Sequence, residues 1–160
     1  MQVLILYYSK GGNTRKLAEA IFKGVEGVEG VKALLKTTDE VTKEDFLLSQ
    51  GIIAGSPVYF GTMSAELKKV FDETIAIRKK MEGKIGAAFA TSGDLTGGKE
   101  TTIMSILQAM LINGMIIVGD PMSATGHYGV GCAGAPGERT TENAIKLGIR
   151  VAELAKTLFS

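Results

Sequence analysis

The chain begins Met1-Gln2-Val3-Leu4-Ile5-Leu6-Tyr7-Tyr8 and continues Ser9-Lys10-Gly11-Gly12-Asn13-Thr14. The first segment is a short, uninterrupted apolar run, which is typical of a strand buried on both faces of a parallel sheet. The second consists mainly of small polar residues and glycines, and an amphipathic helix pattern follows at once. A glycine-rich turn between a strand and a helix directs backbone N–H groups outward at the positive end of the helix dipole. The two segments therefore predict an anion site, and phosphate is the usual occupant of such sites.

The residues of this turn exclude several other phosphate-binding loops. A P-loop needs G-x-x-x-x-G-K-[ST] and many dinucleotide-binding folds use G-x-G-x-x-G, and the turn contains neither pattern. A phosphatase with a cysteine nucleophile needs that cysteine here, but the only one is Cys132. A phosphoacceptor receiver domain needs acidic residues where this chain has Ser9 and Ser56. An ordinary tight connection at Gly11-Gly12 is the alternative interpretation.

The composition predicts a single domain that spans residues 1–160. The formal net charge is +1, so the chain lacks the basic excess of a nucleic-acid-binding protein. One cysteine in the whole chain is typical of a reducing cytoplasm. We see no secretion signal and no apolar stretch of membrane-spanning length, and we therefore expect a cytoplasmic protein without membrane insertion.

Strands alternate with amphipathic helices along the rest of the chain. The expected strands are Met1–Tyr8, Val31–Thr37, Gly51–Gly55, Lys84–Ala90 and Met115–Val118. Helix caps are expected at Asn13 or Thr14 and at Thr140 or Thr141. The apolar stripes of the expected helices include Leu17, Ile21, Leu67, Val70, Ile75, Ile103, Ile106, Met110, Leu111, Leu147, Val151 and Leu158. One helical turn is expected at Lys43–Leu48. This alternation predicts an α/β fold with a parallel sheet covered on both faces.

The loops that follow the strands are expected to meet at one edge of the sheet, where ligands of such folds bind. Besides Ser9–Thr14, these loops are Ser56–Ser64, Thr91–Gly98 and Gly126–Gly129. They offer hydroxyl groups, aromatic rings and glycines whose backbone a flat ligand can approach closely. Together they suit a ligand with a phosphate at one end and a planar polar ring at the other.

The motifs S-x-G-G-N-T, S-P-V-Y-F-G-T-M-S and T-S-G-D-L-T-G-G-K-E occur in this order. This order resembles that of the flavodoxin-like flavoproteins, and it is most similar to the WrbA-type branch, or multimeric flavodoxins, which resemble NAD(P)H:quinone oxidoreductases. The resemblance covers nearly the whole chain. It implies a flavodoxin-like three-layer sandwich, in which a five-stranded parallel sheet of order 2-1-3-4-5 has helices on both faces. It also implies FMN as the cofactor and a homodimer or homotetramer.

The resemblance assigns roles to individual residues by their position. The phosphate of FMN would be held by Ser9, Gly11, Gly12, Asn13 and Thr14. The ribityl chain and the ring would be flanked by Pro57, Val58, Tyr59, Phe60 and Gly61. The polar edge of the ring would be bound by Thr91, Ser92, Gly93, Gly97 and Gly98. His127 would lie near the flavin or the hydride donor, and it is the one candidate catalytic residue.

Several of these residues have a second interpretation. Lys10 and Arg15 either neutralise the phosphate or are solvated charges beside the loop. Tyr59 and Phe60 either contact the ring or fill the space between loop and helix. His127 either belongs to the site or is an exposed or structural histidine, and alone it makes no metal site, so we expect no metal.

The resemblance implies an enzyme, an NAD(P)H-dependent oxidoreductase that passes electrons from a nicotinamide through bound FMN to a quinone-like or other acceptor. A low-potential one-electron carrier between protein partners, a flavodoxin proper, is the second hypothesis. Carrier flavodoxins often stack a Trp on the ring and have an acidic surface, whereas this chain has no Trp and is almost neutral. The composition therefore favours the enzyme. A non-catalytic flavin-binding module is the third hypothesis.

Overall fold

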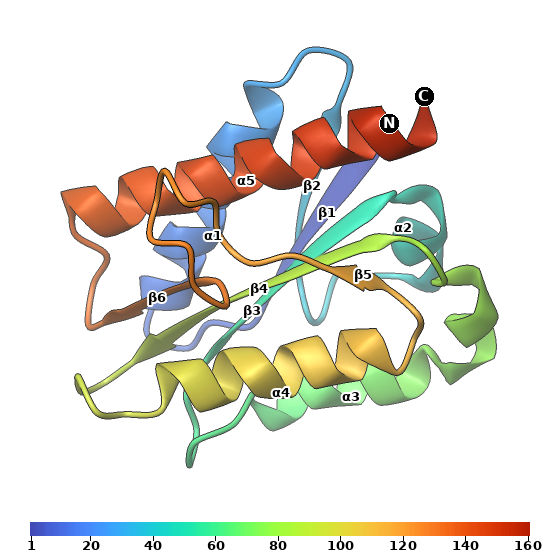
Figure 1. Ribbon diagram of the computed structural model, residues 1–160. Coiled ribbons are helices and arrows are strands. Elements are labelled where there is room, and N and C mark those ends of the chain that lie inside the picture. Colours follow the sequence, from blue (N-terminus) through green and yellow to red (C-terminus); the bar gives the residue numbers. More distant parts are fainter.

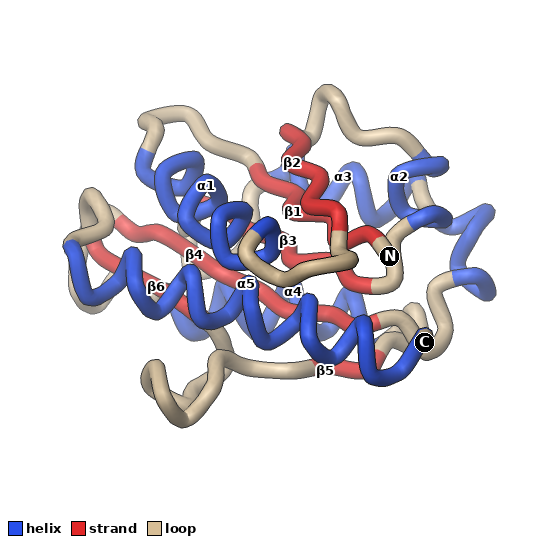
Figure 2. Tube along the Cα trace, turned by 90° about the horizontal axis from the view of Figure 1, so that it is seen from above, coloured by secondary structure: helices blue, strands red, loops and turns tan.

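The computed structural model describes residues 1–160 as a parallel sheet between two layers of helices (Figure 1). Helices α1 (Asn13–Glu26) and α5 (Glu138–Phe159) cover one face of the sheet. Helices α3 (Ala65–Glu73) and α4 (Lys99–Leu111) cover the other face, and Figure 2 shows the sheet enclosed between the two layers. The short helix α2 (Lys43–Leu48), expected as a single turn, and the 3₁₀ helix η1 (Ile75–Lys80) connect these elements.

The sheet confirms the predicted fold class and strand order. Its strands are β1 (Gln2–Tyr7), β2 (Lys32–Thr37), β3 (Gly51–Pro57), β4 (Ile85–Ser92), β5 (Ile116–Ile117) and β6 (Val130–Ala133). All pairs are parallel, and the order is β2-β1-β3-β4-β5, with β6 also paired to β4. The carboxyl ends of the strands therefore lie along one edge, as a ligand site of this fold requires.

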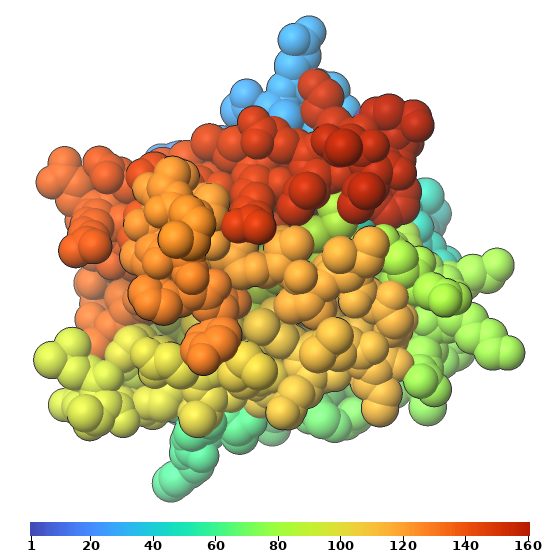
Figure 3. All heavy atoms as spheres, viewed as in Figure 1, coloured from blue at the N-terminus to red at the C-terminus, as the bar shows by residue number.

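The fifth position of the sheet is shared by two short strands, which the sequence did not predict. β5 pairs with the start of β4 at Ile85 and Gly86, whereas β6 pairs with its end from Phe89 to Ser92. Residues 118–129, which we call the insertion, separate them and bulge outward between α4 and α5 (Figure 3, orange). The sequence of β6, Val-Gly-Cys-Ala, has one β-branched residue and no alternation, so neither propensity nor pattern marked it as a strand.

The alternation of β1 explains why its sequence is apolar without interruption. Val3 and Ile5 belong to the core beneath α1 and α5, whereas Leu4 and Leu6 belong to the core beneath α3 and α4. All four side chains are fully buried. Successive residues of a strand face opposite sides of the sheet, so a strand covered on both sides needs apolar residues at every position.

Two helix starts and three stripe positions differ from the predictions. The N-cap of α1 is Gly12, with a φ of 91°, because the Ser9 hydroxyl occupies the capping role that we assigned to Asn13 or Thr14. Helix α5 begins at Glu138, ahead of the expected Thr140 or Thr141 cap. The expected core residues Ile75, Leu111 and Leu158 are 76%, 55% and 52% exposed, because they lie in the last turns of their helices or beyond them. None of the helices combines the length and hydrophobicity needed to cross a membrane.

Helices α1 and α5 approach each other closely at two glycines. A Cβ at Gly24 would lie 2.1 Å from the carbonyl oxygen of Ile145, and a Cβ at Gly148 would lie 2.2 Å from that of Ile21. Both contacts are with backbone atoms, which cannot rotate away as a side chain can. The two glycines therefore set how closely α5 packs on α1, and with it how α1 packs on the sheet.

We predict that Gly24→Ala and Gly148→Ala each destabilise the protein. Alanine favours a helix over glycine by about 1 kcal/mol, but overpacking of a close contact costs about 1–3 kcal/mol, and the contacts at these positions are with backbone. We expect a net loss of up to about 2 kcal/mol in the free energy of unfolding by urea, the difference between those two effects, and a value at the upper end because the contacted backbone cannot move aside. Gly27→Ala is the matched control, because its φ is −68° and its added Cβ would meet nothing closer than 3.5 Å. Equal stability of all three variants would refute this account of the packing.

Candidate functional site

Loops from three strands form a cavity of about 330 Å³ at the carboxyl edge of the sheet, which we call the edge cavity. It is lined by nine of the predicted site residues: Gly11, Asn13, Thr14, Pro57, Val58, Tyr59, Thr91, Ser92 and Gly93. Lys10 and Gly134 complete the lining. The structure thus brings together the loops after β1, β3 and β4, as the sequence predicted.

The loop after β1 presents free backbone N–H groups to this cavity. The Ser9 hydroxyl oxygen accepts hydrogen bonds from the N–H groups of Gly12 and Arg15, at 3.2 and 3.3 Å. The N–H groups of Gly11, Asn13 and Thr14 have no partner within the protein. They lie at the positive end of a 14-residue helix, so the loop is suited to bind an anion. Ser9 itself does not line the cavity, and its hydroxyl stabilises the conformation of the loop through these two hydrogen bonds.

The two cations near this loop differ in their surroundings. Lys10 lines the edge cavity. Arg15 instead forms an ion pair with Glu19, with 2.8 Å between Nε and Oε1, on the exposed surface of α1. Lys10 is therefore positioned beside a ligand in the cavity, whereas Arg15 belongs to a surface ion pair.

A buried hydrogen bond joins the loop after β1 to the end of β4. The hydroxyl oxygens of Thr14 and Thr91 lie 2.7 Å apart, and the two residues are 2% and 4% exposed. Each hydroxyl can donate one hydrogen bond and accept others, so one of them keeps a proton for a ligand in the cavity. The bond ties the start of α1 to the carboxyl end of β4.

The loop after β3 ends in a tight hairpin turn. Tyr59 and Thr62 exchange two backbone hydrogen bonds, of 3.1 and 3.2 Å, around Phe60 and Gly61. Phe60 has a φ of 50° and Gly61 a φ of 79°, as a type I′ turn requires. Tyr59 lines the cavity and its ring meets that of Tyr8 edge to face, with centroids 6.4 Å apart. Phe60 is fully exposed at the tip, so it does not fill the space between loop and helix.

The loop after β4 is held by its own polar groups. Asp94 accepts hydrogen bonds from the N–H and the hydroxyl of Thr96, both at 3.0 Å, and these bonds lower the pKa of its carboxyl group. The Ser92 hydroxyl donates to the carbonyl oxygen of Asp94 at 2.6 Å. Gly97 and Gly98, which were expected at the ring, do not line the edge cavity. Gly98 is instead the N-cap of α4. Gly93 lines the cavity with open space above it.

The structure does not place His127 at the edge cavity. It lines a second cavity, together with Lys99, Tyr128 and Asn143. The expectation that Gly126–Gly129 lies at the carboxyl edge is wrong, because this segment precedes β6 and reaches the sheet level with the middle of β4.

Gly134, which follows β6, takes the place expected for Gly126–Gly129. Its N–H donates to the carbonyl oxygen of Ser92 at 2.8 Å, and it lines the edge cavity. Sequence reasoning missed Gly134 because it did not recognise β6 as a strand. Had β6 been recognised, a glycine directly after it would have been expected at the carboxyl edge of the sheet.

Comparisons with known proteins show the family. A family model described as NADPH-dependent FMN reductase matches residues 1–129. The chain belongs to this family. A flavodoxin from Aquifex aeolicus is 38% identical over 158 residues, which cover 95% of this chain and 85% of the relative. An NAD(P)H dehydrogenase (quinone) from Archaeoglobus fulgidus is 32% identical over 188 residues, which cover 98% of both proteins.

Membership of the FMN reductase family confirms the predicted oxidoreductase class and the predicted cofactor. Among solved structures, the flavodoxin, WrbA-like protein from Agrobacterium tumefaciens matches with a TM-score of 0.85 over 98% of both chains. Its sequence identity of 24% makes this a likeness of fold. It agrees with the predicted flavodoxin-like sandwich.

The edge cavity fits FMN in its donors and its walls. The unpartnered N–H groups at the start of α1 suit the phosphate dianion, and Lys10 adds a positive charge. Tyr59 provides an aromatic wall for a flat ring, and Thr91, Ser92 and Gly93 provide polar groups for the edge of that ring. The cavity thus offers groups suited to the phosphate and to the ring of FMN.

We predict that Thr14→Val weakens FMN binding about tenfold, because loss of one hydrogen bond near a charged group costs about 1.5 kcal/mol or more. Valine matches the shape of threonine and lacks the hydroxyl that reaches the cavity. Thr141→Val is the matched control, since it makes the same substitution near the start of a helix, where the Thr141 hydroxyl donates to the carbonyl oxygen of Gly137 on an exposed part of α5 away from the edge cavity. FMN fluorescence titration measures both affinities. An unchanged dissociation constant for Thr14→Val would contradict the proposed place of the phosphate.

Proposed function

We propose that this protein is an FMN-dependent oxidoreductase that takes electrons from NADH or NADPH and reduces a quinone-like acceptor. The observation that carries the proposal is the edge cavity, in which free N–H groups at the start of α1 face an aromatic wall at Tyr59. The relatives named NAD(P)H dehydrogenase (quinone) support the choice of donor and acceptor.

The residues of the cavity would bind and orient the cofactor. Gly11, Asn13 and Thr14 would hold the phosphate through their N–H groups, as Lys10 lowers the local negative charge. Tyr59 would support the ring and exclude water from one of its sides. FMN, when bound, supplies the redox chemistry, so the proposal requires no acid or base from the protein.

The overall reaction balances with one proton from solvent. The dihydronicotinamide gives up two electrons and one proton and becomes the oxidised nucleotide. The quinone takes up two electrons and two protons, of which the second comes from water. Donor and acceptor would use the open side of the cavity in turn.

A one-electron carrier is the second candidate function. The exposed loop tips favour it. Phe60 is fully exposed and Leu95 is 80% exposed, and each lies on a loop that borders the edge cavity. Exposed apolar residues around a redox site suit docking to another protein. Relatives named flavodoxin belong to this class.

We further propose that residues 1–160 act as one FMN-binding domain in the cytoplasm. Its single cysteine supports that compartment, because Cys132 is buried and forms no disulfide.

We also propose that the chain is a homo-oligomer. An apolar groove of α3, η1 and α4 exposes Ile75, Leu111 and Ile112, at 76%, 55% and 67%. Its lining contains charges of both signs, with Arg78 and Lys79 as well as Asp72 and Glu82, so the face can pair with a copy of itself about a two-fold axis.

The proposed activity predicts that NADH or NADPH bleaches the yellow absorbance of the FMN-loaded protein under anaerobic conditions. One equivalent of benzoquinone should then restore the absorbance. A stopped-flow spectrophotometer measures both steps. If dithionite bleaches the protein and neither nucleotide does, the electron carrier replaces the enzyme as the better account.

The proposed oligomer predicts that Ile112→Glu lowers the molar mass measured by light scattering after size-exclusion chromatography. Burial of an unpaired carboxylate in the groove would be unfavourable. Leu158→Glu is the matched control, because Leu158 is similarly exposed on α5, away from the groove. A monomeric wild-type protein, or an oligomer that both variants retain, would reject this interface.

A further inference from the structure

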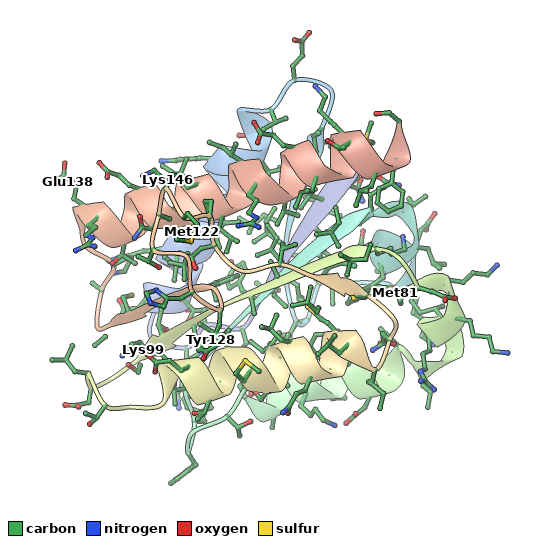
Figure 4. The ribbon with its side chains drawn as sticks, viewed as in Figure 1. Met81, Lys99, Met122, Tyr128, Glu138 and Lys146 are labelled. Atoms are coloured by element: carbon green, nitrogen blue, oxygen red, sulfur yellow. The ribbon has the colours of Figure 1, made fainter.

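A second cavity, separate from the edge cavity, lies between α4, the insertion, β6 and the start of α5. We call it the lateral cavity. Its volume is about 250 Å³, and it shares no lining residue with the edge cavity. Figure 4 shows Tyr128 and Lys99 near each other at the amino-terminal end of α4, where the cavity lies.

The size of the lateral cavity suits a single ring system. Sites for drug-sized ligands range from about 300 to 1,000 Å³, so a cavity of about 250 Å³ is too small for a whole dinucleotide. Its lining residues include two aromatic side chains, His127 and Tyr128, and the apolar Ile103. Such surfaces stack against flat heteroaromatic rings.

The polar groups of the lateral cavity select among flat rings. Asn143 offers an amide, which pairs with the adjacent donor and acceptor on the edge of adenine. Glu100 offers a carboxylate, which accepts a hydrogen bond from an amino group and repels an anionic ring. A neutral purine with an exocyclic amino group matches both residues.

The insertion that forms one wall of this cavity is held in place by a buried carboxylate. Asp120 is 2% exposed. Its oxygens accept hydrogen bonds from the N–H groups of Thr125 and His127, at 3.0 and 2.8 Å, and from the Thr125 hydroxyl. The amino group of Lys146 on α5 donates to the carbonyl oxygen of Ser123 at 2.7 Å. The wall is therefore organised before any ligand binds.

The two cavities lie within the reach of one dinucleotide. Gly131 lines the lateral cavity and Gly134 the edge cavity, and three residues of strand span about 10 Å. Lys99 lines the lateral cavity, and its amino group donates to the carbonyl oxygen of Leu95, in the loop that borders the edge cavity. A positive charge thus lies between the two cavities, where a diphosphate bridge would pass.

We propose that the lateral cavity binds the adenine ring of the dinucleotide electron donor, whose nicotinamide then reaches the edge cavity. This inference rests on the proposed function, because it assigns the donor of that same reaction. Tyr128 stacks on the adenine, Asn143 binds its edge, and Lys99 faces the diphosphate. The insertion that divides the fifth strand is, on this account, the part of the chain that recognises the donor.

The first test is the binding of AMP to the FMN-loaded protein, measured by isothermal titration calorimetry. We expect wild-type protein to bind AMP and Tyr128→Ala to bind it about 5- to 150-fold more weakly, the range measured when a stacking side chain is removed. Asn143→Ala should weaken AMP binding as well. Met122→Ala is the control, because Met122 is 85% exposed on the same insertion and does not line the cavity. Absence of AMP binding, or equal binding by Tyr128→Ala, would overturn the inference.

The second test separates this inference from the proposed function. Reduced nicotinamide mononucleotide has the reacting ring but no adenosine. Tyr128→Ala should raise KM for NADH or NADPH by the factor by which it weakens AMP binding, and it should leave kcat unchanged. With the mononucleotide as donor, KM and kcat should both stay at their wild-type values. An unchanged KM for the dinucleotide would overturn the adenine site alone. A wild-type protein that neither donor reduces, but that binds AMP through Tyr128, would overturn the proposed function and support the site.

Discussion

The position of the amino-terminal end of α1 against the carboxyl edge of the sheet is the constraint on which the site depends. The hydrogen bond between the Thr14 and Thr91 hydroxyls fixes that position from the side of β4. The close contacts at Gly24 and Gly148 fix it from the side of α5. These contacts oppose a shift or tilt of α1, so the unpartnered N–H groups at its start are held at the edge cavity before an anion binds.

The elements with the strongest sequence patterns were predictable. The apolar run of β1 and the helical stripes of α1, α4 and α5 reflect burial, and the order of the strands follows from the resemblance to flavodoxin-like proteins. The polar turns that follow β1, β3 and β4 were predictable for the same reason, since the carboxyl ends of parallel strands share one edge. Nine residues expected at the cofactor site line one cavity as a result.

The insertion and β6 were not predictable by the same reasoning. β6 is four residues long and half of its side chains are small, so tertiary pairing with β4 determines its conformation more than its own propensity does. Because β6 was missed, His127 was expected at the wrong edge and Gly134 was overlooked. The acceptor role of the Ser9 hydroxyl toward the N–H groups of Gly12 and Arg15 was not predicted either, because it depends on the left-handed conformation of Gly12.

In this account the lateral cavity recognises the electron donor, and the edge cavity binds the flavin that carries out the redox chemistry. The loops at the carboxyl edge of the sheet line the edge cavity, where we propose that FMN binds, whereas the insertion adds a wall that the sheet alone does not provide. Asp120 organises that wall alone, since its carboxylate accepts hydrogen bonds only from Thr125 and His127 within the insertion, and it lines neither cavity. Recognition of the donor can therefore change through the insertion without disturbing the loops around the flavin.

The affinity of the protein for FMN compared with riboflavin, which lacks only the phosphate, tests the central claim most directly. Fluorescence titration of both flavins measures it. Hydrogen bonds to a charged group are worth about 1.5–3 kcal/mol each, so three N–H donors at the start of α1 predict that FMN binds at least about 1,000-fold more tightly. Equal affinity for the two flavins would show that the N–H groups of α1 do not hold the phosphate, and the account of the edge cavity would be wrong.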